Sequence, residues 1–140
     1  MQLITSDCLQ LNRFYKENKD KARAKPSDLM FVARDEDEQV RAALRLLPYQ
    51  GFLFLRSVLT QAEYRGQGLA SELIQFVIQQ QANSAMNLPI YTLPTPLALP
   101  LYIRLGFKTI NREEIPSELL ASYRRFRQSD NGPAVMVIQP

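Results

Sequence analysis

The sequence predicts a mixed α+β fold in which an antiparallel meander of strands comes first and strands alternate with helices afterwards. Two observations carry this prediction. Apolar runs separated by turn residues fill positions 29–60, and beyond them segments of helical periodicity alternate with short apolar runs. A chain of 140 residues with 46% hydrophobic side chains is large enough for one core. We therefore expect residues 1–140 to form a single domain.

The first half is expected to contain a short strand, a helix and a three-stranded meander. Asp7 is a candidate N-cap of the helix, because its carboxylate can accept hydrogen bonds from the first turn. The acidic residues 35–38 mark a hairpin turn, and the run after Gly51 is apolar enough for a central strand. The expected elements are strands at 3–4, 29–33, 40–47 and 52–60 and a helix from residue 9 to about 21.

The second half is expected to alternate helices and strands. Thr95 and Pro96 have the residue types of an N-cap and first helical position, Pro100 would kink or delay that helix, and Gly106 suits its left-handed end. The expected elements are helices at 69–81, 97–105 and 115–127 and strands at 89–93, 107–110 and 134–138.

Composition excludes several kinds of chemistry. Cys8 is the single cysteine and histidine is absent, so neither a disulfide, a zinc site nor a histidine-based triad is expected, and we expect no metal. The formal charge of +3 suits an anionic small ligand at least as well as nucleic acid. No apolar run approaches the roughly 20 residues of a membrane helix, and the N-terminus is unlike a signal peptide. We therefore expect a cytoplasmic protein with no membrane partner.

The loop at 61–68 has the features of a phosphate-binding loop. It joins a strand to a helix, and free N–H groups of a first helical turn converge with the helix dipole on an anion. Gly66 and Gly68 allow close approach of the backbone, and Arg65 adds a positive charge. The loop lacks the Lys and Ser/Thr of a Walker A motif and fits the dinucleotide fingerprint poorly. It predicts a pyrophosphate ligand.

Two motifs in order make this sequence resemble the GNAT superfamily of acyl-CoA-dependent N-acetyltransferases. The loop Arg65-Gly66-Gln67-Gly68-Leu69-Ala70 satisfies the pattern Gln/Arg-x-x-Gly-x-Gly/Ala. Downstream, the segment from Thr95 to Phe107 is similar to Asn-x-x-Ala-x-x-Leu-Tyr-x-x-x-Gly-Phe. The resemblance covers roughly residues 29–110. It implies a GNAT-like acyl-CoA N-acyltransferase fold, with a central, mostly antiparallel mixed sheet of six to seven strands flanked by about four helices.

The resemblance also implies a function and a site. The activity would be transfer of an acetyl group from acetyl-CoA, as co-substrate, directly to a primary amine. The pantetheine arm would lie between the central strand and the next parallel one, and Tyr102 would act as general acid toward the departing thiolate. The residues implied in cofactor binding are Val58, Leu59, Thr60, Arg65, Gly66, Gln67, Gly68, Leu69, Ala70, Thr95 and Tyr102.

The sequence departs from the family pattern in its central strand and at Thr95. The central strand carries Phe54 and Arg56 in the region where many members place a glutamate base, and Thr95 stands where asparagine is usual. We assign no base. An acyl-CoA-binding regulatory module with weak or no turnover is therefore the alternative to an active enzyme. A nucleic-acid binder, based on six basic residues in 13–25, has little else in its favour, so nucleic acid is not an expected partner.

Two further hypotheses concern the acceptor and the assembly. Arg41, Arg45 and Arg56 alternate on neighbouring strands and could bind an acceptor bearing a carboxylate or phosphate, although exposed sheet positions explain them equally well. The arginines at 124, 125 and 127 are interpreted as complementing a helix C-terminus. The last strand, 134–138, is expected to expose an edge along which a second copy pairs, which would give a homodimer.

Overall fold

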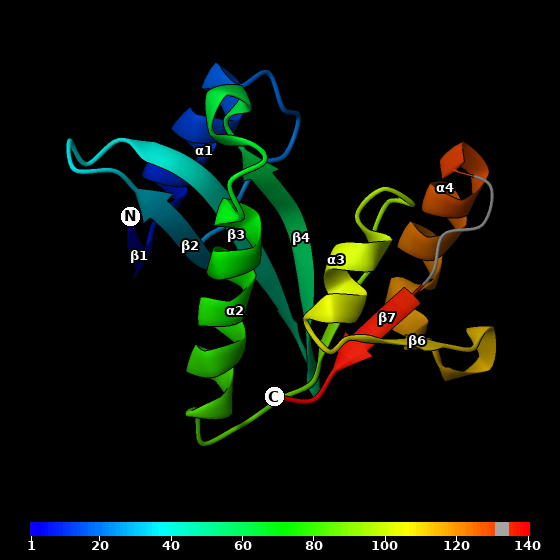
Figure 1. The fold of residues 1–140 in the computed structure, drawn as a ribbon. Coiled ribbons are helices and arrows are strands. Elements are labelled where there is room, and N and C mark those ends of the chain that lie inside the picture. Colours follow the sequence, from blue (N-terminus) through cyan, green and yellow to red (C-terminus); the bar gives the residue numbers. More distant parts are fainter. Residues whose placement is uncertain (131–134) are drawn as a thin grey trace.

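A mixed seven-stranded sheet with four α-helices forms the part of the molecule that the structure, a computed structural model, describes: residues 1–130 and 135–140, with backbone alone at 126–130. This confirms the predicted α+β fold. The strand order is β1-β2-β3-β4-β5-β7-β6, and only β4 and β5 run parallel (Figure 1). The elements are β1 (Gln2–Thr5), α1 (Cys8–Glu17), β2 (Leu29–Arg34), β3 (Val40–Tyr49), β4 (Phe52–Thr60), α2 (Leu69–Ala82), β5 (Ile90–Thr92), α3 (Leu99–Arg104), β6 (Lys108–Ile110), α4 (Leu120–Asp130) and β7 (Val135–Ile138).

The two faces of the sheet are covered by different helices. Leu53 and Leu55 of β4 pack in a cluster with Leu73 of α2 and Tyr102 of α3. Their neighbours along the strand, Phe52 and Phe54, pack instead in a cluster with residues of the segment that enters α4. Successive side chains of a strand point to opposite faces. Helices α2 and α3 therefore lie on one face, and α4 lies on the other, as does α1, whose core residues pack on Val32 and Ala43.

The helix α1 begins as its N-cap predicts and ends earlier than expected. The Asp7 carboxylate accepts a hydrogen bond from the Gln10 N–H at 2.9 Å. At the other end the Asn18 N–H donates to the Phe14 carbonyl, and Lys19 takes a left-handed backbone with φ of 58°. This turn stops the helix at Glu17, whereas periodicity had predicted residue 21.

The helix α3 starts at Leu99, later than predicted, and Thr95 is not its N-cap. The Thr95 carbonyl accepts from the N–H groups of Ala98 and Leu99, which makes a separate turn before the helix. Pro100 falls in the first helical turn, where a missing N–H leaves no broken bond. This proline therefore delays the helix without kinking it, and Gly106, with φ of 100°, closes it as predicted.

The last strand lies inside the sheet, so the edge expected for dimerisation is absent from the described residues. β7 pairs with β5 from Ile90↔Ile138 to Thr92↔Met136 and, on its other side, with β6. The strand prediction at 134–138 holds for Val135–Ile138, while residue 134 is outside the described residues. The edge argument for a homodimer is wrong because β6 occupies the free side of β7.

Candidate active site

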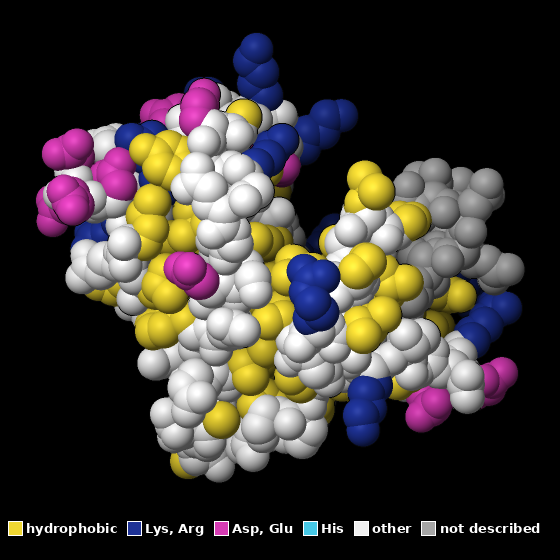
Figure 2. All heavy atoms as spheres, viewed as in Figure 1, with side chains coloured by type: hydrophobic (Ala, Val, Ile, Leu, Met, Phe, Trp, Pro, Cys, Tyr) yellow, Lys and Arg dark blue, Asp and Glu magenta, His cyan; other side chains and the backbone are white. Residues whose placement is uncertain are grey.

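A cleft opens through the sheet where β4 and β5 separate. The parallel pairing stops at Leu55↔Thr92, although β4 continues to Thr60. Beyond that point a cavity of about 1210 Å³ is lined by the end of β4, the loop before α2, the segment after β5, α3 and two residues of α4. Figure 2 shows the molecule deeply notched between the side of α1 and α2 and the side of α3 and α4. The predicted splay of the central strand is therefore present.

A β-bulge causes β4 to leave β5. Arg45 pairs with Arg56 but Ala43 pairs with Leu59, so two steps along β3 oppose three steps along β4. Bulges bend the strand that holds the extra residue and strengthen its twist. Ser57 sits within the bulge with a left-handed φ of 58°, a conformation that costs a non-glycine residue roughly 1–2 kcal/mol. Surrounding contacts must therefore hold it.

Buried side chains behind the sheet supply those contacts. The Tyr15 hydroxyl donates to the Ser57 carbonyl at 2.8 Å, and the Arg45 Nε–H donates to the Ser57 Oγ at 3.2 Å. Arg45 in turn forms an ion pair with Asp28 at 3.0 Å, with both residues only 7% exposed. Burial raises the pKa of Tyr15, and Arg45 partly opposes that rise, so the hydroxyl stays a donor. This network fixes the bend that opens the cleft.

The arginines considered for an acceptor pocket therefore have different roles. Arg45 is buried with Asp28 and cannot reach a ligand in the cleft. Arg41 pairs with Asp35 at 2.8 Å and lies over the Tyr64 ring, outside the cleft lining. Only Arg56 of the three lines the cleft. The alternation of arginines in the sequence could not distinguish these roles, because Arg45 is buried by its ion pair with an aspartate 17 residues away in the chain.

The glycine loop presents its backbone to the cleft. Gly66 and Gly68 both have a left-handed φ of 79°, and no atom lies within 4 Å of where a Cβ of either would be. Gly68 is the N-cap of α2 and provides no side-chain hydrogen bond, so the first N–H groups of this 14-residue helix keep no capping partner. Arg65 is held against the end of β4 by a hydrogen bond from its Nε–H to the Thr60 carbonyl at 2.9 Å. An anion can approach this turn closely.

Ten of the eleven predicted site residues line this cleft, including Tyr102 and Thr95. The exception is Gln67, which is exposed and whose amide points toward the Glu63 carbonyl at 3.5 Å. The residues brought together are Val58, Leu59, Thr60, Arg65, Gly66, Gly68, Leu69, Ala70, Thr95 and Tyr102.

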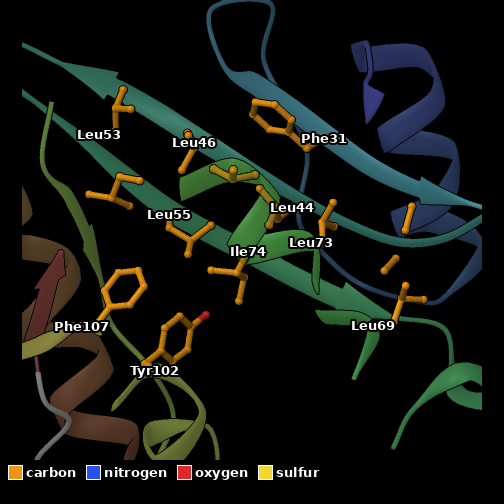
Figure 3. Packing of buried hydrophobic residues seen from close by; sticks show 14 of the residues in the cluster. Phe31, Leu44, Leu46, Leu53, Leu55, Leu69, Leu73, Ile74, Tyr102 and Phe107 are labelled. Atoms are coloured by element: carbon orange, nitrogen blue, oxygen red, sulfur yellow. The ribbon is translucent and has the colours of Figure 1, made fainter. Parts of the chain in front are cut away.

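Tyr102 is the buried titratable group of the cleft wall. It is 5% exposed and packs edge to face on Phe107, with the ring centroids 5.2 Å apart, as Figure 3 shows. Burial raises the pKa of the phenol, and the neighbouring Thr92 side chain lowers it by less. The phenol is therefore fully protonated at neutral pH. Its O–H group is therefore available as a proton or hydrogen-bond donor in the cleft wall.

The described lining of the cleft contains four arginines, Arg56, Arg65, Arg104 and Arg125, and no aspartate or glutamate. Sequence reasoning missed Arg104 and Arg125 as cleft residues. Arg125 had been interpreted as complementing a helix end, but α4 packs across the sheet and brings it to the cleft beside Ser122, whose Oγ it contacts at 3.4 Å. No local sequence signal indicates this position, because it depends on how α4 packs against the sheet.

Comparisons with known proteins agree with this geometry. The model of the acetyltransferase (GNAT) domain matches residues 26–109. No curated protein matches the chain. Among solved structures, the Mycobacterium tuberculosis protein Rv2747, determined with CoA, superposes with a TM-score of 0.72 at 12% identity, covering 100% of this chain and 99% of that one.

Two further structures share the fold. A spermidine N-acetyltransferase variant from Vibrio cholerae has a TM-score of 0.70 at 17% identity, over 99% of this chain and 95% of that one. The Tetrahymena GCN5 structure has a TM-score of 0.63 at 15% identity, over 92% and 84%. At such identities the likeness shows the fold alone, but the family model spans more than half of the 140 residues. The chain therefore belongs to the GNAT family of acetyltransferases.

Proposed function

We propose that this protein is an acetyl-CoA-dependent N-acetyltransferase that moves an acetyl group directly to a primary amine. The observation that carries the proposal is the cleft itself. It combines an uncapped helix N-terminus, a strand edge left without a partner and a buried, protonated tyrosine within one cavity. These features meet the needs of a ligand with a pyrophosphate at one end and a thioester at the other.

The residues of the cleft fit acetyl-CoA at two places. Beyond Leu55, no strand pairs with the β5-facing edge of β4 in the described part of the chain, so backbone groups of Val58, Leu59 and Thr60 can bond an extended amide-containing arm. The N–H groups at the start of α2, with Arg65 beside them, can hold the pyrophosphate. When bound, acetyl-CoA supplies the activated acetyl group.

Tyr102 is the proposed general acid. Its raised pKa keeps the phenol protonated, so it can give its proton to the thiolate sulfur as the carbon–sulfur bond breaks and the amine nitrogen becomes acylated. Arg56 occupies the strand region where many family members carry a glutamate base, and no carboxylate lines the described cleft. The amine therefore loses its proton to water, and an acceptor with a low amine pKa is favoured.

Ligand-dependent thermal unfolding tests the cofactor site first. A ligand at 100 times its Kd adds about 2.7 kcal/mol and should raise the Tm of a chain of this size by several degrees. We expect acetyl-CoA and CoA at about 1 mM to do so, and ATP and NAD not to. An equal response to ATP or NAD, or no response to acetyl-CoA, would contradict the proposal.

Turnover is tested separately by thiol release from acetyl-CoA with a panel of amines. Binding of acetyl-CoA without acetylation of any amine would favour the alternative of a regulatory acyl-CoA-binding module, which the missing carboxylate base also favours.

A further inference from the structure

A second cationic site lies in the same cleft, on the other face of the sheet from the glycine loop. Arg56 stacks over the Phe54 ring at 5.5 Å, and Phe54 packs in the cluster beneath α4. The glycine loop belongs instead to the face of α2, where Leu69 packs with Leu55. Arg56 is also four residues before Thr60 along β4, roughly 13 Å at the rise of a strand. A pyrophosphate at the start of α2 is therefore out of its reach.

Arg125 approaches the same place from α4. It lines the cleft with Arg56, and its positive charge, after burial and the charge of Arg45, contributes to lowering the pKa of Arg56. Two guanidinium groups that repel each other are stabilised by an anion between them. The buried acid Asp28 is already paired with Arg45 at 3.0 Å.

No acidic side chain of the described residues pairs with Arg56. The Arg56 side chain forms no hydrogen bond or ion pair with the described residues, and its guanidinium contacts the Phe54 ring. The lining on both faces holds arginines and no carboxylate. A charged side chain exposed to solvent needs no partner, but here the guanidinium faces a cavity through which an acceptor must enter.

We infer that the acceptor is a small amine that carries its own anionic group, a carboxylate or a phosphate, and that Arg56 and Arg125 bind this group while the amine faces the thioester. The inference rests on the proposed function and names its substrate class. Arginine suits both anions because its planar fork can donate two parallel hydrogen bonds to either. A polyamine such as spermidine would bring like charge to this wall and is expected to be a poor acceptor.

Matched pairs of amines test the inference directly. Thiol release from acetyl-CoA is measured with L-amino acids against their amides and with phosphoethanolamine against ethanolamine, with spermidine as the cationic arm. We expect the anionic member of one pair to have a kcat/KM at least tenfold above that of its neutral partner. Which of the two pairs shows this preference distinguishes a carboxylate from a phosphate. Equal use of neutral partners, or preference for spermidine or for a peptide, overturns the inference.

Arginine variants locate the effect. R56Q and R125Q should each lose about tenfold or more of the preference for the anionic amine, mainly through KM, because a hydrogen bond to a charged group is lost. R124Q is the matched control, since Arg124 is an exposed neighbour on α4 outside the described lining. A loss in R124Q as large as in R125Q would indicate a general charge effect and overturn the assignment.

A binding readout separates this inference from the proposed function. With CoA bound, N-acetylglycine should raise the Tm of the wild type more than N-acetylglycinamide does, and R56Q should abolish the difference. If CoA stabilises all variants but this difference is absent and no anionic amine is acetylated, the inference fails and the cofactor site stands. If CoA itself gives no stabilisation, the proposed function fails.

Discussion

The environment of Tyr102 shows how burial keeps a phenol in its acid form. The main cause of its raised pKa is the loss of solvent around the phenolate, because charged groups are poorly stabilised in an apolar wall. Phe107 and the surrounding aliphatic residues supply that wall. A group with a raised pKa stays protonated until the pH exceeds its ordinary value near 10. The acid form is therefore constant across the physiological range.

Replacing Tyr102 by Phe should lower kcat by about 10²–10⁴-fold if the phenol is the proton donor. The phenyl ring fills the same space, so the Tm and the stabilisation by CoA should stay close to wild type. In the wild type, kcat should fall only above about pH 10, since deprotonation of the Tyr102 phenol removes the proton donor. Y102F should lack this fall in a kcat–pH profile. Tyr91→Phe, a tyrosine outside the cleft lining, is the control; an unchanged kcat in Y102F would leave Tyr102 a packing residue.

Disrupting the Asp28–Arg45 ion pair should reduce the free energy of unfolding more than disrupting the other described ion pair. Asp28→Ala leaves a buried guanidinium unpaired, and losing one partner of such a pair destabilises by about 3–5 kcal/mol. The double variant D28A/R45M removes the stranded charge and should lose less stability than D28A alone. Urea unfolding measures both. Asp35→Ala, in the more accessible pair with Arg41, should change stability little; a comparable loss there would contradict the assigned importance of burial.

At the scale of elements, the strand-to-helix junction at the end of β4 combines two local devices. The bulge at Ser57 turns the strand away from β5, and the left-handed glycines turn the chain into α2 with its N–H groups uncapped. Neither device requires a side chain that touches a ligand. The geometry of the backbone alone therefore shapes this end of the cleft.

Gly51 provides a matched control for this junction. Gly51 and Gly68 have φ of 85° and 79°, and neither would bring a Cβ within 4 Å of another atom. Substitution by Ala should therefore destabilise both equally, by about 1–2 kcal/mol for the left-handed backbone. Only G68A should also weaken the binding of CoA, because its methyl group would project where the ligand approaches the N-terminus of α2. Calorimetric Kd values and urea unfolding separate the effects; equal CoA affinity in G51A and G68A would contradict the proposed loop function.

At the scale of the molecule, the sheet is divided by the cleft but the core is not. The connection between β4 and β5 has only three registered pairs, Leu53↔Ile90 to Leu55↔Thr92. One apolar cluster nevertheless includes Leu55 and Ile74 from one side and Phe107 and Met136 from the other. Figure 3 shows Tyr102 and Phe107 packed into this shared region. We therefore propose that the chain is one domain.

Unfolding should then be a single cooperative transition. The chain has six tyrosines and no tryptophan, so tyrosine fluorescence reports tertiary packing, and far-UV circular dichroism reports helices and strands. The urea midpoints from the two signals should coincide. Two separated transitions, with part of the helical signal lost first, would indicate that the halves beside the cleft unfold independently.

No helix in the described ranges is long and apolar enough to cross a membrane.

The predicted elements depended on local signals and were largely confirmed. The bounds of β4 and the start of α2 agree with the sequence, because apolar runs and glycines determine them within a few residues of chain. The C-terminal end of α1 and the start of α3 were less well predicted. These boundaries depend on the left-handed backbone of Lys19 and on the proline in the first turn of α3. Both involve competition among neighbouring hydrogen bonds, which hydrophobic periodicity does not reveal.

The sequence by itself determined the order of elements through its apolar periodicity, and it indicated the glycine loop before α2 and Tyr102 through short motifs. Only the tertiary structure decided which arginine is buried in an ion pair and which lines the cleft. Arg45 is paired with Asp28, which directly precedes β2. Arg56 reaches the cleft where the bulge turns β4 away from β5, and Arg125 reaches it because α4 packs across the sheet. The position of β7 between β5 and β6 was also decided there. These outcomes depend on register and on contacts between residues far apart in the chain, which no local pattern encodes.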